Sequence, residues 1–406
     1  MSVATERPEL ARHPTVRIRT ADSAADSHRA IKLFDFEGPI GIVDGALEVT
    51  DRRVGPEDRN DTHYGRTIYL EGHSAFMHHV IAKGKGQIGH DVIFPLPSLL
   101  YHGVTNQDIS NLVTDLFKRT PGSPEHIAHL KNRHQAHTVT ITTAYEQAHT
   151  ELALGQVGLD DIVATDFPID RIREDLQKSG RFDTEMAMTG AWLKDCYLLI
   201  SKRENSGNDR EKATLTRRLR SRIMHFFTEE LGLTWNEEGQ MAPYQGKFRT
   251  QLGEAMAGLY VVGDREKANV VRRYSKPGLV QEGGPRPSYI ADGVNDVLAL
   301  QAAEWSIGLN GSDAAKAAKI GVAAMNIGPV LIALDDAIAH YINPTPENVE
   351  AVINQTQEVI GKGTALIHKG GPDMSTEHSG IHSEMKEAVR GPNGSIVDNL
   401  HIPKIS

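Results

Sequence analysis

Cysteine is almost absent from this chain: among its 406 residues, Cys196 is the only one. A single cysteine excludes an intrachain disulfide, and it also excludes a zinc site built from several thiolates. Such low use of cysteine is typical of proteins in reducing compartments, so we expect a cytoplasmic protein.

Basic residues are fewer than acidic ones. The chain has 44 Lys and Arg and 53 Asp and Glu, so its formal net charge is −9. Proteins that bind nucleic acids generally draw their affinity from Lys and Arg side chains that neutralise phosphates. The charge balance therefore disfavours general nucleic-acid binding, while a small anion held through a metal ion is compatible with it.

Long apolar runs are missing as well. The longest, residues 320–334, is interrupted by Asn326, Gly328 and Pro329 and is too short to cross a bilayer comfortably. The sequence therefore predicts no membrane-spanning segment.

The apolar content is nevertheless sufficient for folding. Hydrophobic residues make up 39% of the chain and charged residues 24%, a composition far from that of disordered chains.

A chain of 406 residues exceeds the size at which one hydrophobic core usually stops growing. We therefore expect a core domain with large insertions. Residues 1–28 have no sustained period and predict a mobile tail.

Short strand-like runs recur along the chain, and helical patterns follow several of them. The runs comprise residues 31–36, 137–142, 162–167, 288–292 and 306–311. Alternating strands and helices predict an α/β fold with a parallel sheet, and such sheets bind ligands at the carboxyl ends of their strands. The predicted core consists of residues 29–44, 131–169 and 259–345.

Two long segments, residues 45–130 and 170–258, interrupt this alternation. Connections of that length are uncommon inside a compact core unless they form domains or lids, so we interpret both as largely helical cap insertions over the site. Residues 346–406 follow the core. They predict a helix capped by Thr345 with Pro346 at its first position, and then an irregular tail from about residue 364, which is rich in Gly and His.

Two carboxylates, Asp35 and Glu37, lie where the first strand breaks at a Gly-Pro turn. A carboxylate is a competent nucleophile toward phosphorus, and a second acid can protonate a leaving oxygen and later deprotonate a water molecule. Taken alone, two acids at such a turn are more often ordinary turn residues.

A second acidic group follows the fourth strand. Asp292, Asn295 and Asp296 lie within one helical turn around a glycine, and their oxygens can bind a hard cation such as Mg²⁺. The alternative interpretation is a helix N-cap, in which the same side chains accept hydrogen bonds from exposed amides.

Threonines and a lysine complete the set of candidates. Thr142 and Thr143 end the second strand, where a hydroxyl and nearby backbone N–H groups can bind a phosphoryl oxygen, although threonines there are also common caps. Lys267 precedes the fourth strand, and its ammonium can balance the carboxylates and a transferring phosphoryl group.

The order of these groups resembles the signature of the haloacid dehalogenase-like (HAD) superfamily, which has an Asp-x-Asp strand end, a Ser or Thr strand end, a Lys, and a Gly-Asp-x-x-x-Asp strand end. The matching positions in this chain are Asp35 with Glu37, Thr142, Lys267, and Asp292 with Asp296. Residues 139–167 are similar to the phosphoserine-phosphatase type of second motif. The resemblance covers the core and leaves the insertions and the tail unmatched.

This resemblance implies a Rossmann-like core and a reaction through an aspartyl-phosphate on Asp35. It also implies Mg²⁺ held by Asp35, the backbone carbonyl of Glu37 and Asp292, with Asn295 and Asp296 in support. The ion pumps of the superfamily carry Thr at the position of Glu37, and its dehalogenases lack the acid. Glu37 keeps acid-base function and so favours hydrolysis of a phosphomonoester.

Two residues depart from the superfamily pattern: Glu37 replaces the usual Asp, and Ala291 replaces the usual Gly. The leading prediction is a Mg²⁺-dependent phosphatase that acts on a small phosphorylated metabolite. The alternatives are a phosphotransferase or phosphomutase on the same core, to which the longer Glu37 side chain is suited, and a non-catalytic accessory or binding protein. The sequence identifies neither the substrate nor the oligomeric state.

Overall fold

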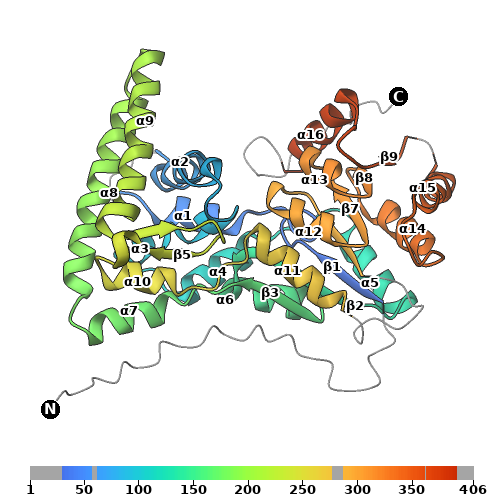
Figure 1. Cartoon of the computed structure of the whole chain (residues 1–406), viewed down its shortest axis with the longest axis horizontal. Helices are drawn as coiled ribbons and strands as arrows, with labels where there is room; N and C mark the ends of the chain where they lie inside the picture. The colour runs from blue at the N-terminus through green and yellow to red at the C-terminus, as the bar shows by residue number, and fades with distance from the viewer. Residues whose placement is uncertain (1–29, 57–61, 277–286, 362, 391–406) are drawn as a thin grey trace.

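The computed structural model describes residues 30–56, 62–276, 287–361 and 363–390 of the chain (Figure 1). The predicted mobile tail, residues 1–28, lies outside the described residues. Within these ranges, no helix combines the length and the apolar character that crossing a membrane requires.

In the described part of the chain, seven strands form the central sheet, in the order β3-β2-β1-β6-β7-β8-β9. Their bounds are β1 Ile31–Phe34, β2 His137–Tyr145, β3 Asp161–Thr165, β6 Ser288–Ala291, β7 Trp305–Leu309, β8 Ile320–Ala323 and β9 Leu366–Lys369. Neighbouring strands run parallel, except that β9 is antiparallel to β8. The predicted α/β class is confirmed, and each of the five predicted runs coincides with a strand of this sheet.

The direction of strand addition reverses beside β1. This strand pairs with β2 on one side and with β6 on the other. The chain runs outward from β1 through β2 to β3, returns to β6, and then runs outward through β7 to β8. Open parallel sheets bind ligands at such a reversal, outside the carboxyl ends of the strands. The residues that follow β1 and β6 therefore lie where a ligand is expected.

Helices bury both faces of the sheet, as parallel strands require. Side chains alternate between the faces along β1: Ile31 and Leu33 belong to one buried apolar cluster, and Phe34 belongs to a larger one. The first cluster includes residues of α11 (Asp264–Tyr274), α12 (Val297–Ala302) and α13 (Ser312–Ala317). The larger cluster includes residues of α5 (Ser123–Arg133), α6 (Glu146–Thr150), the π-helical turn Glu151–Val157 and α14 (Gly328–Ile338).

Lys32 interrupts the apolar pattern of β1. Its side chain is buried, and its ammonium lies 2.5 Å from Asp335 of α14. His126 of α5 contacts the other oxygen of the same carboxylate at 2.6 Å. Burial works against the charge of Asp335, but Lys32 and His126 outweigh it and hold the pKa of that carboxyl below its ordinary value. The network gives the buried charges partners and links the central strand to two helices.

The two insertions are largely helical, as predicted. The first contains α1 Gly45–Arg53, α2 Tyr64–His79, the 3-10 turns Ile81–Lys83 and His90–Ile93, α3 Leu96–Tyr101 and α4 Asn106–Leu116. The second contains α7 Ile169–Lys178, α8 Phe182–Glu204, α9 Asp209–His225, the π-helical turn Phe226–Glu230, the hairpin β4 Leu233–Trp235 and β5 Met241–Pro243, the 3-10 turn Tyr244–Gly246 and α10 Gln251–Ala257. The predicted end of the first insertion, residue 130, falls inside α5, a helix that packs against α14 and β2.

The insertions pack against each other although they are far apart in sequence. α2 contacts α8 and α9, and in Figure 1 α8 and α9 stand side by side with α2 next to them. Glu71 of α2 accepts hydrogen bonds from Arg203 of α8 at 3.1 Å and from Arg220 of α9 at 2.6 Å. The two segments therefore form one helical body beside the sheet.

The end of the chain is more regular than predicted. α15 spans Pro346–Ile360, and the hydroxyl of Thr345 accepts a hydrogen bond from the Asn348 amide, which confirms the predicted cap. The prediction of an irregular tail is wrong for residues 364–390, because β9 and the helix α16 (Thr376–Arg390) form there. Its remaining part, residues 391–406, lies outside the described residues. β9 forms by pairing with β8, a tertiary contact, and α16 buries Met385 and Val389, four residues apart. The many Gly and His residues of this segment make the strand pattern of β9 and the helical pattern of α16 hard to recognise in the sequence.

Candidate active site

A cavity of about 270 Å³ lies at the carboxyl ends of β1 and β6. Asp35 directly follows β1 and Asp292 directly follows β6, and the backbone N–H of Asp35 donates to the Ile290 carbonyl at 2.9 Å. The lining residues come from the ends of β1, β2 and β6, the first insertion and α16: Asp35, Glu37, Asp44, Ala46, Tyr69, His73, Ile88, Gly89, Asp91, Val92, Thr143, Ala144, Asp292, Gly293, Val294, Asn295 and Lys386. The sheet reversal thus places two predicted acids in one cavity.

Lys267 holds two of the predicted acids together. Its side chain is completely buried, and its ammonium lies 2.7 Å from Asp296 Oδ1 and 3.0 Å from Asp35 Oδ1. The hydroxyl of Tyr289 in β6 also donates to Asp296 Oδ1, at 2.5 Å. Asp296 therefore orients Lys267, and Lys267 orients the carboxylate of Asp35.

The electrostatics of this group follow from burial and mutual repulsion. Burial, and then the charge of Asp296, raise the pKa of Asp35 well above its usual value, while Lys267 opposes them. For Lys267, burial works against the charged form, but Asp296 and Asp35 outweigh it and raise the pKa of the ammonium. The lysine therefore stays charged, and a further cation beside Asp35 would favour its ionised form.

The acidic residues can hold a metal ion. Asp35, Asp292 and Asp296 are all buried and offer carboxylate oxygens within 4.8 Å of one another. Carboxylate oxygens in a water-accessible cavity are ligands that suit Mg²⁺. Asp35 and Asp292 line the cavity, whereas the oxygens of Asp296 already accept from Lys267, Tyr289 and the Gly293 amide. The donor set fits a magnesium ion shared mainly by Asp35 and Asp292.

Glu37 connects the site to the first insertion. Its Oε1 accepts a hydrogen bond of 3.0 Å from the amide of Gly45, the first residue of α1. Asp44 caps the same helix by accepting from the Leu47 amide. Both carboxylates line the cavity. The predicted acid-base residue is therefore oriented by the N-terminus of α1, where partial positive charge stabilises an anion.

The chain passes very close to Asp292 at Gly38. A Cβ at this position would lie 2.4 Å from Asp292 Cγ, and the backbone has φ of +111°, which side-chain-bearing residues rarely adopt. The turn after β1 thus needs glycine for two reasons. Because the backbone at Gly38 comes so close, the Asp292 carboxylate lies beside the turn that follows Asp35.

The two predicted threonines point in different directions. Thr143 lines the cavity, and its hydroxyl accepts a hydrogen bond of 3.0 Å from the side-chain amide of Asn295. Thr142 is buried outside the cavity lining, and its hydroxyl accepts from the Ala144 amide at 3.1 Å. The structure brings Thr143, rather than Thr142, together with the acids.

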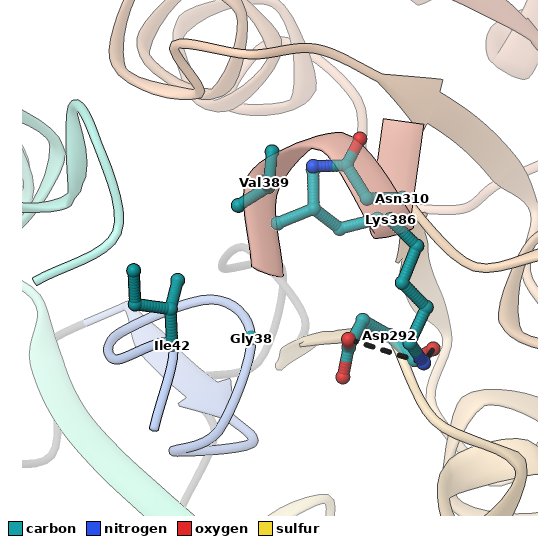
Figure 2. Close-up of a pocket in the computed structure, with 7 residues that line it drawn as sticks. Gly38, Ile42, Asp292, Asn310, Lys386 and Val389 are labelled. Carbon is teal, nitrogen blue, oxygen red and sulfur yellow. Dashed lines mark hydrogen bonds and ion pairs between the residues drawn. The ribbon is translucent and has the colours of Figure 1, made fainter. Parts of the chain in front are cut away.

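Several lining residues were missed from the sequence. His73 and Asp91 of the first insertion form a hydrogen bond of 2.8 Å, which raises the pKa of His73. Lys386 reaches the cavity from α16 and contacts Asp292 (Figure 2). Asp44 has a recognisable signal, since an Asp before a helical pattern predicts an N-cap. His73, Asp91 and Lys386 have none, because their positions depend on packing between distant segments.

Other reactive side chains in the described part lie elsewhere. His129, His134 and Asp336 also place ligand atoms within 4.8 Å of one another, and both imidazole Nε2 atoms lie 2.8 Å from Asp336 Oδ1. The hydrogen bonds of the two imidazoles to the Asp336 carboxylate explain why these three side chains lie close together. Cys196 is buried in α8, and burial raises the pKa of its thiol to about 12, so it is a poor nucleophile at neutral pH.

Comparison with known proteins relates the chain to solved structures. No protein-family model and no curated protein sequence matches it. A gene product from Archaeoglobus fulgidus is 16% identical and aligns with a TM-score of 0.63 over 92% of this chain and 100% of its own. Phosphoserine phosphatase, as an analogue of its phospho-aspartyl intermediate, is 12% identical, with a TM-score of 0.35 over 70% of this chain and 88% of its own. Its substrate-bound complex is 11% identical, with the same TM-score and 87% of its own chain covered. At 16% identity, the similarity to the archaeal gene product is one of fold.

Proposed function

We propose that this protein is a Mg²⁺-dependent phosphatase that hydrolyses a small phosphorylated metabolite through an aspartyl-phosphate on Asp35. The observation that carries the proposal is the convergence of Asp35, Lys267, Asp292 and Asp296 from three separate segments at the sheet reversal. A carboxylate that is held by a buried lysine and lies in a cavity lined by further acids is an arrangement suited to phosphoryl transfer.

Each side chain has a role in this proposal. A carboxylate oxygen of Asp35 attacks phosphorus, and the bond between phosphorus and the ester oxygen breaks. Glu37 donates a proton to the leaving oxygen, then removes a proton from the water that hydrolyses the acyl phosphate and releases inorganic phosphate. Lys267 holds Asp35, and Thr143 binds a phosphoryl oxygen. Mg²⁺, held by Asp35, the Glu37 carbonyl and Asp292, would neutralise charge on the phosphoryl group.

The volume of the cavity supports the proposal that the substrate is small. The cavity volume of about 270 Å³ is near the lower end for small-molecule sites. Residues of the first insertion, including Tyr69, His73 and Asp91, line it together with the strand ends. The insertions are therefore proposed to act as caps that select the substrate and limit the access of water.

The test is Mg²⁺-dependent release of phosphate from an aryl phosphate and from a panel of phosphorylated metabolites. Asp35→Asn should reduce kcat by at least about a thousandfold, while the exposed control Asp313→Asn should match the wild type. Removal of the metal with a chelator should abolish turnover, and added Mg²⁺ should restore it. Inactivity of the wild type across the panel, or full activity of Asp35→Asn, would refute the proposal. Product analysis separates hydrolysis from transfer, because transfer retains the phosphoryl group on a second substrate.

A further inference from the structure

Lys386 brings a positive charge to the candidate active site from outside the predicted core. It lies in α16, and its ammonium donates to the main-chain carbonyl of Asp292 at 2.8 Å and lies 3.3 Å from Asp292 Oδ2. Figure 2 shows the side chain extending from the helix to Asp292. The contact joins the last described helix to the loop that follows β6.

The position of Lys386 is fixed by the packing of its helix. Its neighbour Met385 and Val389, on the next turn, are buried. Two histidines link α16 to the sheet edge, since His382 of α16 lies 2.8 Å from His368 of β9 (Nε2 to Nε2). The helix also packs against α13 and β8. Lys386 is therefore held at the cavity by the tertiary structure.

The negative charge of the cavity indicates why a lysine is needed beside Asp292. Five carboxylates line the cavity: Asp35, Glu37, Asp44, Asp91 and Asp292. A phosphomonoester carries about two negative charges at neutral pH, so these carboxylates repel it. Among the lining residues in the described part of the chain, Lys386 is the single Lys or Arg, because Lys267 lies behind Asp35 and is fully buried.

The side chain is also able to reach an incoming group. About one third of its surface is exposed (32%), in contrast to the completely buried side chain of Lys267. Lys386 lines both the main cavity and a small hollow of about 10 Å³ beside Gly38, so the side chain has free space around it. A lysine ammonium on a four-carbon stem carries three rotatable donors. It can keep the bond to the Asp292 carbonyl and offer another donor to a phosphoryl oxygen.

We propose that Lys386 is a substrate-binding residue that contacts a non-bridging oxygen of the phosphoryl group. This inference rests on the proposed phosphatase function. It makes α16 part of the active site, so that substrate binding depends on the C-terminal segment as well as on the sheet. Lys267 orients the nucleophile, whereas Lys386, which contacts Asp292, binds the phosphoryl group.

The experiment compares the wild type with Lys386→Met and Lys386→Arg, and uses Lys316→Met, an exposed lysine of the neighbouring α13, as the matched control. Calorimetry measures the Kd of inorganic phosphate in the presence of Mg²⁺, and the Kd of Mg²⁺ alone. Steady-state kinetics with an aryl phosphate give KM and kcat separately. Urea unfolding checks that each variant is folded.

We expect Lys386→Met to raise both the phosphate Kd and the KM by about tenfold, the effect of one lost charge-assisted hydrogen bond. Lys386→Arg should recover much of the loss, and Lys316→Met should match the wild type. Magnesium affinity should be unchanged or higher in Lys386→Met, because the variant removes a cation from Asp292.

Two results overturn the inference: absence of phosphate binding by the folded wild type, or an unchanged phosphate Kd in Lys386→Met. If that unchanged phosphate Kd is accompanied by tighter Mg²⁺ binding, Lys386 only competes with the metal for Asp292. A wild type that hydrolyses no phosphomonoester refutes the proposed function, and the phosphate titration then still decides the role of Lys386. If Lys386→Met unfolds, the Arg variant and its phosphate Kd decide instead.

Discussion

Gly38 shows how one small residue determines the geometry of the candidate site. The atoms of the Asp292 carboxyl lie between 2.4 and 2.8 Å from the point where a Cβ of residue 38 would be. Real Cβ atoms do not tolerate such contacts, so a side chain at this position would displace Asp292 from its place beside Asp35. The positive φ of +111° adds a conformational reason for glycine.

Gly38→Ala should therefore reduce aryl-phosphate hydrolysis by at least about a hundredfold, because it displaces a candidate metal ligand. The matched control is Gly371→Ala: Gly371 also has a positive φ, +135°, but a Cβ there meets nothing within 4 Å. The control variant should lose stability of about 1 kcal/mol and keep its activity. Equal activity of the two variants would argue against the close approach at Gly38.

At the scale of elements, the end of β2 determines which threonine lines the cavity. Thr142 is buried outside the cavity lining, and its hydroxyl accepts a hydrogen bond from the Ala144 amide. The sequence motif alone aligns Thr142 with the signature, whereas Thr143 lines the cavity and bonds to Asn295. The register between β2 and β3 also shifts between Ile141 and Tyr145, which alters the strand where it meets the site.

Thr143→Val should reduce kcat/KM by about tenfold to a hundredfold, because it removes a hydroxyl from the cavity. Thr142→Val is the natural partner for comparison. It should leave kcat/KM within about twofold and lower the free energy of unfolding by about 1 to 2 kcal/mol, because the Ala144 amide loses its acceptor. The reverse pattern, with activity lost only in Thr142→Val, would show that Thr142 binds the phosphoryl group.

At the scale of the whole molecule, the sheet and the insertions bury several histidines in their neutral form. Burial lowers the pKa of His149 in α6 from 6.5 to about 4, and it lowers the pKa of His90 in the first insertion by the same amount. His149 packs against the ring of Phe36, directly after Asp35, with ring centroids 5.1 Å apart. The neutral imidazoles thus contribute to the packing around the site.

The stability of the protein should therefore fall in mild acid. Between pH 6.5 and 4 the unfolded chain binds more protons at these histidines than the folded chain, so their contribution is complete above pH 6.5 and is lost as the pH falls toward 4. At pH 5 the expected loss is about 2 kcal/mol per histidine. Urea unfolding at a series of pH values measures the slope. His149→Asn should reduce the slope by about one histidine's share, while the exposed control His340→Asn should not. An identical slope in all three proteins would contradict the assignment.

The extent to which the site could be predicted depends on how local each signal is. Asp35, Asp292 and Asp296 follow recognisable strands, and Lys267 lies in a helix that precedes one of these strands. The order of the four residues along the chain was therefore enough to predict that they form one site. Thr345 is a comparable case in the fold, because a cap acts within one helical turn. The hydrogen bond from Gly45 to Glu37 and the contact between Lys386 and Asp292 have no local signal. They exist because an insertion and a C-terminal helix fold back onto the sheet.

The sequence by itself determined the α/β class, the parallel strands, the helical insertions and the ordered set of acids, because strand periodicity, caps and chain order are properties of neighbouring residues. Tertiary structure alone decided that Lys267 is shared by Asp35 and Asp296, that Thr143 lines the cavity, and that the segment after residue 364 forms β9 and α16. The cytoplasmic location stays a prediction to be tested. The physical reason for the division is that pairing of a short strand such as β9, and burial of a charge such as Lys267, are stabilised by partners far away in the chain.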